Sequence, residues 1–276
     1  MPTTILPKNM QPITIIKLGG SLLTYKDKAY SIRFEVFESL GIEIADCVAA
    51  FPETKFILLN GAGSFGHHTV KKYNLDKGFT ETNSKFGFAK VLQDTAKLNR
   101  LLVDNLLNCN LAAISFQPST VFYADQNGYQ FSSLELLTNY LESSILPCLY
   151  GELIVDTVQG SRVLSADTIP DLLVDFFLKT NNYRVQKVIN LGSYDGVLDN
   201  QNQVIELINR QNYDTVKQHL YETQNVDVSG GMIKKIQEFL ALADKKVESV
   251  IMSGLAPGNL KKYLSGQPVL GTKIGY

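Results

Sequence analysis

Cysteine is scarce in this sequence of 276 residues, and its distribution argues against both a disulfide framework and a zinc site. Cys47, Cys109 and Cys148 lie far apart, and three cysteines cannot all pair with one another. The sequence contains no Cys-x-x-Cys pair or Cys/His cluster, so the ligand spacing of a zinc site is missing. We expect three reduced, mostly buried thiols in a cytoplasmic protein, and no metal held by protein side chains.

Excess charge and long apolar runs are also missing. Lysine and arginine number 26 against 27 aspartates and glutamates, so the chain lacks the basic excess that a nucleic-acid surface normally needs. No apolar run is long enough to span a bilayer, and the first residues, MPTTILPKNMQP, lack the apolar segment of a signal peptide. Hydrophobic residues nevertheless make up 45%, enough for a sizeable core. We expect a soluble intracellular protein without a nucleic-acid or membrane partner.

Short apolar runs alternate with longer segments of helical periodicity along the chain. The predicted strands are residues 13–18, 55–60, 112–117, 145–151, 185–191 and 248–254, and the predicted helices are residues 33–51, 82–108, 134–144, 167–179 and 230–245. Residues 151–156 and 161–165 flank a turn and predict a hairpin. Strands that alternate with helices predict an α/β fold, with a mostly parallel sheet between two helical layers in a three-layer αβα sandwich. The polar stretch KTNNYR predicts a boundary near residue 180, between lobes 1–180 and 181–276 that share one continuous sheet.

Glycine clusters follow three of the predicted strands, and a fourth opens a helix. They are KLGGS, NGAGSFGH, NLGSYDG and DVSGGMIKK. Ligands of parallel sheets gather outside the carboxyl ends of the strands, and glycine turns at helix N-termini bind anions. One glycine pair is ordinary turn chemistry. Several glycine turns on one edge of the sheet, together with Lys17, Lys26 and Lys235, favour a ligand with more than one phosphate.

Two common phosphate-binding signatures guide the alternatives. The P-loop pattern G-x-x-x-x-G-K-[ST] is missing, which excludes a P-loop enzyme. Gly61, Gly63 and Gly66 fit G-x-G-x-x-G, so a Rossmann-type dinucleotide-binding oxidoreductase is an alternative. In that fold an acidic residue at the end of the next strand, about 20 residues after the glycines, binds the ribose of the dinucleotide. Asp76 and Glu81 lie near that distance, but YNLDKGFTE does not resemble a strand end.

Six segments together resemble the amino acid kinase superfamily. They are KLGGSLLTYK, NGAGSFGHHTVKKY, SFQPSTVF, VLSADTIPDLL, DVSGGMIKKI and GTKI, in the expected order from residue 13 to near the end. Within that superfamily the chain is most similar to the isopentenyl phosphate kinases, and the Gly-Ser-Phe-Gly-His run is also typical of fosfomycin kinases. The resemblance implies the amino acid kinase fold, a homodimer, and transfer of the γ-phosphoryl group of ATP, with Mg²⁺, to a short prenyl monophosphate. A phosphonate kinase and a non-catalytic nucleotide-sensing module are the alternatives.

The resemblance also implies residue roles. Lys17 would reach the transferred phosphoryl group, Lys26 would stabilise the transition state, and Lys235 would hold the ATP phosphates. Asp167 would organise Lys17 and Lys235, whereas its spacing alone suggests the N-cap of a helix. His67 would donate to the acceptor phosphate, while His68 is interpreted as a surface residue.

The remaining implied contacts divide between the two substrates, with ATP mainly on the C-terminal lobe and the acceptor on the N-terminal lobe. The residues implied to bind ATP are Lys17, Gly19, Gly20, Ser21, Gly63, Gly192, Asp195, Gly231 and Lys235. The residues implied to bind the acceptor are Gly61, Ala62, Gly66, His67 and Gly151. Phe86, Phe88 and Val91 are predicted to line the pocket for the apolar tail of the acceptor, and they fit the plain core of the fold equally well.

The chain departs from the family pattern at two places. Asn60-Gly61-Ala62-Gly63 stands where relatives commonly have His-Gly-Gly-Gly, and alanine restricts the backbone more than glycine does. At the second place relatives usually have Thr-Asp-Val-Asp-Gly, and this chain has Gly192-Ser193-Tyr194-Asp195-Gly196. The first carboxylate of the motif is lost, and with it the basis for expecting purine or ribose contacts there. Neither change touches the predicted phosphoryl-transfer residues, so we expect an active kinase.

Overall fold

The computed structural model describes residues 10–25, 27–180, 182–222 and 226–275, and a sheet of eight strands runs through its centre. The strands are β1 (Gln11–Leu18), β2 (Lys55–Asn60), β3 (Ala113–Ser115), β6 (Leu146–Tyr150), β9 (Tyr183–Gly192), β10 (Leu207–Ile208), β11 (Glu248–Ser253) and β12 (Gly271–Ile274). Their order is β10-β12-β11-β9-β1-β2-β6-β3. Six of the seven neighbouring pairs in this order are parallel, as predicted, and the pair of β11 and β12 is antiparallel.

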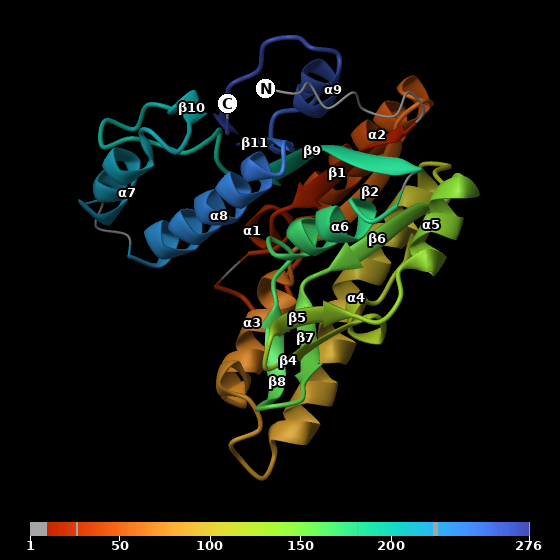
Figure 1. Cartoon of the computed structure of the whole chain (residues 1–276), viewed down its shortest axis with the longest axis vertical. Coiled ribbons are helices and arrows are strands. Elements are labelled where there is room, and N and C mark those ends of the chain that lie inside the picture. The colour runs from red at the N-terminus through yellow and green to blue at the C-terminus, as the bar shows by residue number, and fades with distance from the viewer. Residues whose placement is uncertain (1–9, 26, 181, 223–225, 276) are drawn as a thin grey trace.

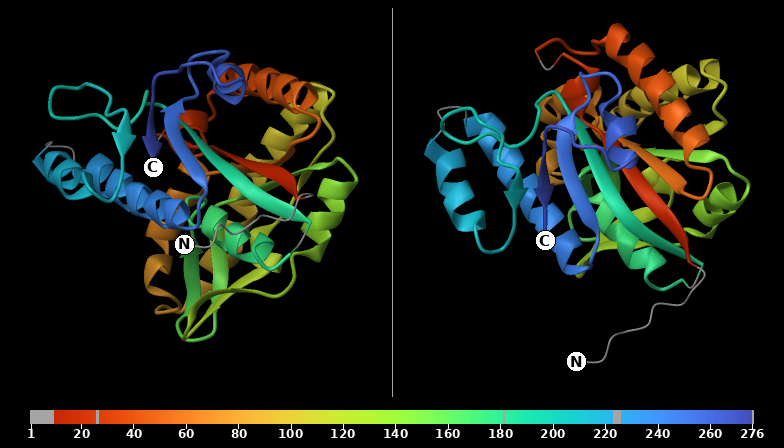
Figure 2. Two further views of the ribbon diagram at one scale, coloured as in Figure 1. Left: turned by 45° about the horizontal axis from the view of Figure 1, so that its top comes forward. Right: turned by 90° about the horizontal axis from the view of Figure 1, so that it is seen from above.

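Helices cover both faces of this sheet (Figures 1 and 2). On one face lie α2 (Phe34–Ala50), α4 (Ser84–Asn108) and α9 (Asn259–Leu264), and on the other lie α5 (Glu135–Glu142), α6 (Ile169–Phe177) and α8 (Val226–Asp244). Strand β1 contributes side chains to the cores on both faces, because successive side chains of a strand point to opposite faces. Ile13 and Ile15 pack toward α6 and α8, and Ile16 and Leu18 pack toward α2 and α4. The predicted three-layer αβα sandwich is confirmed.

A second sheet extends from the main body beside α4 (Figure 1). It contains β4 (Phe122–Asp125), β5 (Gly128–Phe131), β7 (Glu152–Asp156) and β8 (Gly160–Leu164), in the order β5-β4-β7-β8. The β7/β8 hairpin was predicted, and the structure confirms it. The β4/β5 hairpin was not, although its Asn127-Gly128 turn is a hairpin signal. Leu153 of β7 packs with Val91 of α4, which attaches this sheet to the long helix.

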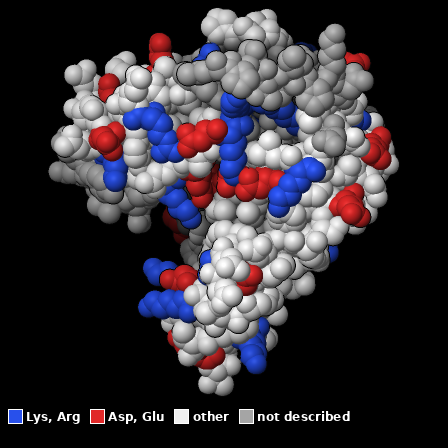
Figure 3. Space-filling model, viewed as in Figure 1, with Lys and Arg blue, Asp and Glu red and all other residues white. Residues whose placement is uncertain are grey.

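The central sheet is continuous across residue 180, because β9 pairs with β1 in parallel. The proposed lobes 1–180 and 181–276 therefore contribute strands to one sheet, and their division of labour between substrates stays a prediction. Acidic and basic side chains are interspersed on the face shown in Figure 3. Among the described residues, no helix is both long enough and apolar enough to cross a membrane.

Candidate active site

A cleft of about 360 Å³ opens at the carboxyl ends of four adjacent parallel strands, β9, β1, β2 and β6. This is the edge of a parallel sheet at which ligands bind. Gly61, Gly151 and Gly192 lie at three of these strand ends and line the cleft. The glycine clusters of the sequence therefore meet in one place, as predicted.

Glycine lets the turns after β1 and β2 touch. A Cβ on Gly20 would lie 2.6 Å from the backbone nitrogen of Gly63, closer than such atoms approach. Gly63 begins α3 (Gly63–Lys72) with a φ of 52°, a left-handed conformation that favours glycine. The Thr24 hydroxyl then joins the two turns, because it donates to the Gly20 carbonyl at 2.8 Å and accepts from the Ser64 N–H at 2.9 Å. Both turns are thus held against each other in the lining of the cleft.

Alanine at position 62 fits this turn without strain. Ala62 has φ −63° and ψ −22°, an ordinary helical conformation for alanine. A Cβ on Gly66 would come within 2.6 Å of the Ala62 Cβ, so alanine at 62 requires glycine at 66. The departure from the family pattern therefore leaves the backbone of the turn in a normal geometry.

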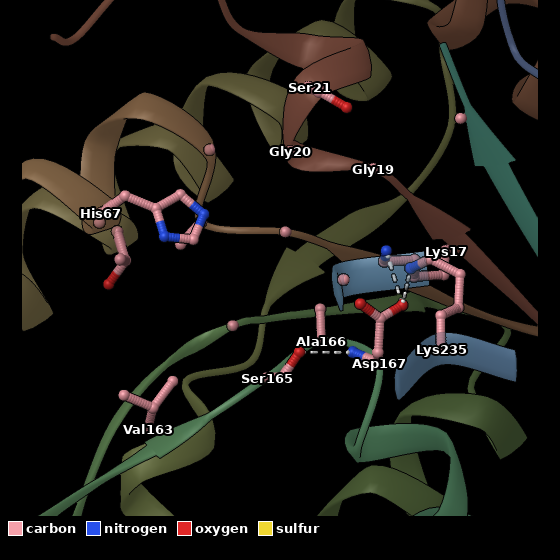
Figure 4. A pocket seen from close by; sticks show the side chains of 18 of the residues that line it. Lys17, Gly19, Gly20, Ser21, His67, Val163, Ser165, Ala166, Asp167 and Lys235 are labelled. Atoms are coloured by element: carbon pink, nitrogen blue, oxygen red, sulfur yellow. Dashed lines mark hydrogen bonds and ion pairs between the residues drawn. The ribbon is translucent and has the colours of Figure 1, made fainter. Parts of the chain in front are cut away.

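Lys17, Asp167 and Lys235 form the charged centre of the cleft (Figure 4). The alternation along β1 directs Lys17 to the same face as Ile13 and Ile15, toward α6 and α8. Asp167 lies two residues before α6, and Lys235 lies on α8. Lys17 Nζ is 2.8 Å from Asp167 Oδ1, and Lys235 Nζ is 2.5 Å from the same oxygen. One carboxylate oxygen therefore holds two ammonium groups side by side.

Burial sets the electrostatics of this centre. The Lys17 side chain is only 6% exposed, and burial lowers its pKa to about 8 although the Asp167 carboxylate opposes the shift. Burial alone would raise the pKa of Asp167, but the charges of Lys17 and Lys235 outweigh it and hold that pKa well below its usual range. Asp167 is therefore ionised at neutral pH, and the cluster as a whole is positive.

The structure contradicts the capping interpretation of Asp167. The N-cap of α6 is Thr168, and its hydroxyl donates to Glu238 Oε1 at 2.9 Å. The Asp167 side chain instead accepts from the two lysines, while its backbone N–H donates to Ser165 Oγ. The carboxylate therefore pairs with the lysines of the cleft and does not cap α6.

Most of the predicted site residues line this one cleft. They are Lys17, Gly19, Gly20, Ser21, Gly61, Ala62, Gly63, Gly66, His67, Gly151, Asp167, Gly192, Gly231 and Lys235. Figure 4 shows His67 across the cleft from the lysine–aspartate cluster, with its ring pointing into the space between them. His68 is exposed and is not among the described lining residues, which distinguishes the two histidines.

Two predictions do not coincide with the described cleft, and a third falls on a residue that the structure does not describe. Asp195 is exposed and does not appear among the described lining residues. Ser193 and Tyr194 of the same turn do line the cleft. Lys26 lies outside the described residues. Of the predicted tail wall only Val91 lines the cleft. Phe86 is 66% exposed, and Phe88 packs in a small cluster with Phe79, so both were wrong as lining residues.

The apolar half of the cleft comes from the second sheet and the helices beside it. Its walls are Val70, Val91, Leu153 and Val163. Leu153 and Val163 are cross-strand partners in the β7/β8 hairpin and therefore face the same way. Sequence reasoning missed them and also missed Asn190, although the hairpin pattern itself could have paired Leu153 with Val163.

The fold and the site define an ATP-dependent kinase. The family model of the amino acid kinase family matches residues 12–253, and the chain belongs to that family. An isopentenyl phosphate kinase of Methanothermobacter thermautotrophicus is 32% identical over 94% of this chain and 98% of its own length. The isopentenyl phosphate kinase of Methanocaldococcus jannaschii is 29% identical over 96% of this chain and 99% of its own length. A solved isopentenyl phosphate kinase structure, 29% identical, has a TM-score of 0.76 and covers 95% of this chain and 100% of that chain.

The depressed pKa of Lys17 predicts a lysine that titrates apart from the others. In an NMR titration of ¹³C-labelled lysine side chains, with the signal assigned by Lys17→Arg, we expect loss of the Lys17 proton near pH 8. Asp167→Asn should lower that pKa further, because the carboxylate that favours the charged form is gone.

Asp171→Asn is the matched control, since Asp171 lies on the same helix and pairs with Lys245. It should leave the Lys17 titration unchanged. A Lys17 signal that titrates near the ordinary value of 10.5 would contradict the burial argument.

Proposed function

We propose that the protein transfers the γ-phosphoryl group of ATP to isopentenyl phosphate, or to a similar short prenyl monophosphate, and releases the diphosphate for isoprenoid precursor synthesis. The observation that carries this proposal is the cleft itself. Two ammonium groups lie on one side of it and His67 lies across from them, and two glycine turns and an apolar wall line the same cleft. The name shared by the relatives supports the same reaction.

The chemistry of the acceptor fits these residues. The second pKa of a phosphate monoester is near 6, so the acceptor is already a dianion at neutral pH. No general base has to remove a proton, and the barrier comes mainly from bringing two polyanions together. Lys17 and Lys235 would neutralise that charge, while the Gly19 and Gly20 amides would receive phosphoryl oxygens. His67 would donate a hydrogen bond to the acceptor phosphate.

Magnesium fits the cleft as a companion of the nucleotide. Among the described residues, no group of three or more His, Cys, Asp or Glu side chains could hold a metal ion. Mg²⁺ often binds through substrate phosphates and water with few protein ligands. When bound, it would supply further neutralisation of phosphate charge. The protein's own part is to place Lys17 and Lys235 beside the phosphates.

The tail of the acceptor would lie against the apolar wall. Val70, Val91, Leu153 and Val163 offer only hydrocarbon surface, which suits a short branched alkyl chain. We assign the acceptor to lobe 1–180 and most of the nucleotide to lobe 181–276, in a cytoplasmic enzyme. A phosphonate acceptor of the fosfomycin type presents a similar anion with a smaller tail and is the competing substrate.

A panel of acceptors tests the reaction. Purified protein with ATP and Mg²⁺ should phosphorylate isopentenyl phosphate, and dimethylallyl phosphate to some extent, because both combine a phosphate with a short apolar tail. Fosfomycin, glutamate, aspartate and UMP complete the panel, with diphosphate product measured by mass spectrometry. Turnover of fosfomycin alone would favour the phosphonate kinase. Nucleotide binding without turnover of any acceptor would favour a sensing module.

His67 and His68 provide a matched pair of variants. His67→Ala should lower turnover by a factor on the order of 10²–10³, because a donor to the reacting phosphate is lost. ATP affinity should change little, and both variants should fold, since both side chains are exposed. Steady-state kinetics with nucleotide-binding measurements would show this. Near-normal turnover of His67→Ala, or equal damage from His68→Ala, would contradict the assignment.

The family resemblance also favours a homodimer that buries a helix of the first lobe against its symmetry mate. Ile42 of α2 and Leu101 and Leu107 of α4 are exposed apolar side chains on two helices of that lobe. Light scattering should give a mass near twice the 30.7 kDa of the chain. A mass of one chain at every concentration would exclude the dimer.

A further inference from the structure

Asn190 lies in the cleft beside Lys17, and the chemistry above gives it no role. It is the register partner of Lys17 on β1 and of Ile251 on β11. Register partners in neighbouring parallel strands project from the same face, so the amide lies between these two side chains. Asn190 is 3% exposed and lines the cleft.

The side-chain oxygen of Asn190, Oδ1, is buried and lacks a hydrogen-bond partner in the described part of the chain. Asn60, also a buried amide at a strand end, behaves differently. It accepts from Asn99 Nδ2 at 2.8 Å and donates to the Gly61 carbonyl. A buried amide without a partner costs stability, whereas Ile251 beside it shows that an apolar side chain suits this face. The polar residue is therefore kept at a cost, and since a phosphate oxygen cannot pair with Oδ1, we look to the N–H group of the amide for its purpose.

Gly192 keeps one side of this amide accessible. A Cβ on Gly192 would lie 3.8 Å from Asn190 Nδ2, and the other atom within 4 Å would be the Tyr194 backbone nitrogen. The backbone of Gly192 is not in the left-handed region, so its conformation does not require glycine. Gly192 also stands where the family pattern has threonine. The missing side chain leaves space above the Asn190 N–H at the edge of the cleft.

We propose that Asn190 Nδ2 donates a hydrogen bond to the polyphosphate of ATP beside Lys17. This proposal rests on the proposed function. Phosphate oxygens only accept hydrogen bonds, and Nδ2 is a donor on the open side of the amide. A neutral amide adds direction without competing with Asp167 for the two ammonium groups, as a second carboxylate would. Asn190 and Gly192 thus act together as a nucleotide contact at the end of β9.

Two substitutions of similar size test the contact. Binding of ATP and of inorganic tripolyphosphate would be measured by calorimetry. Asn190→Leu should weaken both ligands by about tenfold, the effect of losing a hydrogen bond to a charged group. Asn190→Asp should weaken both further, because a carboxylate repels the phosphates. The melting temperature of Asn190→Leu should stay the same or rise, since the unsatisfied oxygen is removed.

Two further variants separate this role from a structural one. Ser249→Ala is the matched control, because Ser249 is buried on β11 with Oγ unpartnered among the described residues, and it does not line the cleft. It should leave both affinities unchanged. Gly192→Val should fill the space above Nδ2 and weaken both ligands while Asn190 is intact.

Each outcome decides the proposal. Unchanged affinity in Asn190→Leu overturns it, as does a loss for ATP without a loss for tripolyphosphate, which would place the contact on adenosine. A loss of affinity matched by a fall in melting temperature would show a structural role. If the unaltered protein fails to bind ATP, the proposed function itself fails.

Discussion

A single carboxylate oxygen, Asp167 Oδ1, organises the charged side of the cleft. Two ammonium groups that repel each other lie within 2.8 Å of it, one from β1 and one from α8. Without the carboxylate, two buried positive charges would face each other unpaired, and removing one partner of a buried ion pair typically destabilises a protein by about 3–5 kcal/mol. With it, the cluster is stable but keeps a net positive charge. That surplus suits the two polyanionic substrates that we propose for the cleft.

The fold brings these groups together through the geometry of the sheet. Strand alternation directs Lys17 toward α6 and α8, and the parallel register places Asn190 and Ile251 beside it on the same face. Gly20 and Gly63 allow the turns after β1 and β2 to touch, so that both turns line the cleft. The charged cluster, the glycine turns and the apolar wall are therefore positioned by the arrangement of the backbone.

Much of this arrangement could be predicted from local patterns. The apolar run ITIIKL followed by two glycines predicted both a buried strand and a lysine at its end, and the ends of parallel strands must share an edge. Asn190 could not be found in this way, because its importance depends on its register with Lys17 and on the space above Gly192. The prediction that Phe86 and Phe88 line the tail pocket was wrong for a related reason. Helical periodicity shows that one side of α4 is apolar, but not which turns face the cleft and which face solvent. The role of Asp195 and the division of substrates between lobes stay predictions.

A crystal structure with a non-hydrolysable ATP analogue and isopentenyl phosphate would test this account most directly. The account predicts that the γ-phosphate lies within hydrogen-bond distance of Lys17 Nζ, with Lys235 on the adjoining phosphate and His67 on the acceptor. Asp167 should still accept from both lysines. A polyphosphate bound elsewhere, with the lysine–aspartate cluster untouched, would contradict it.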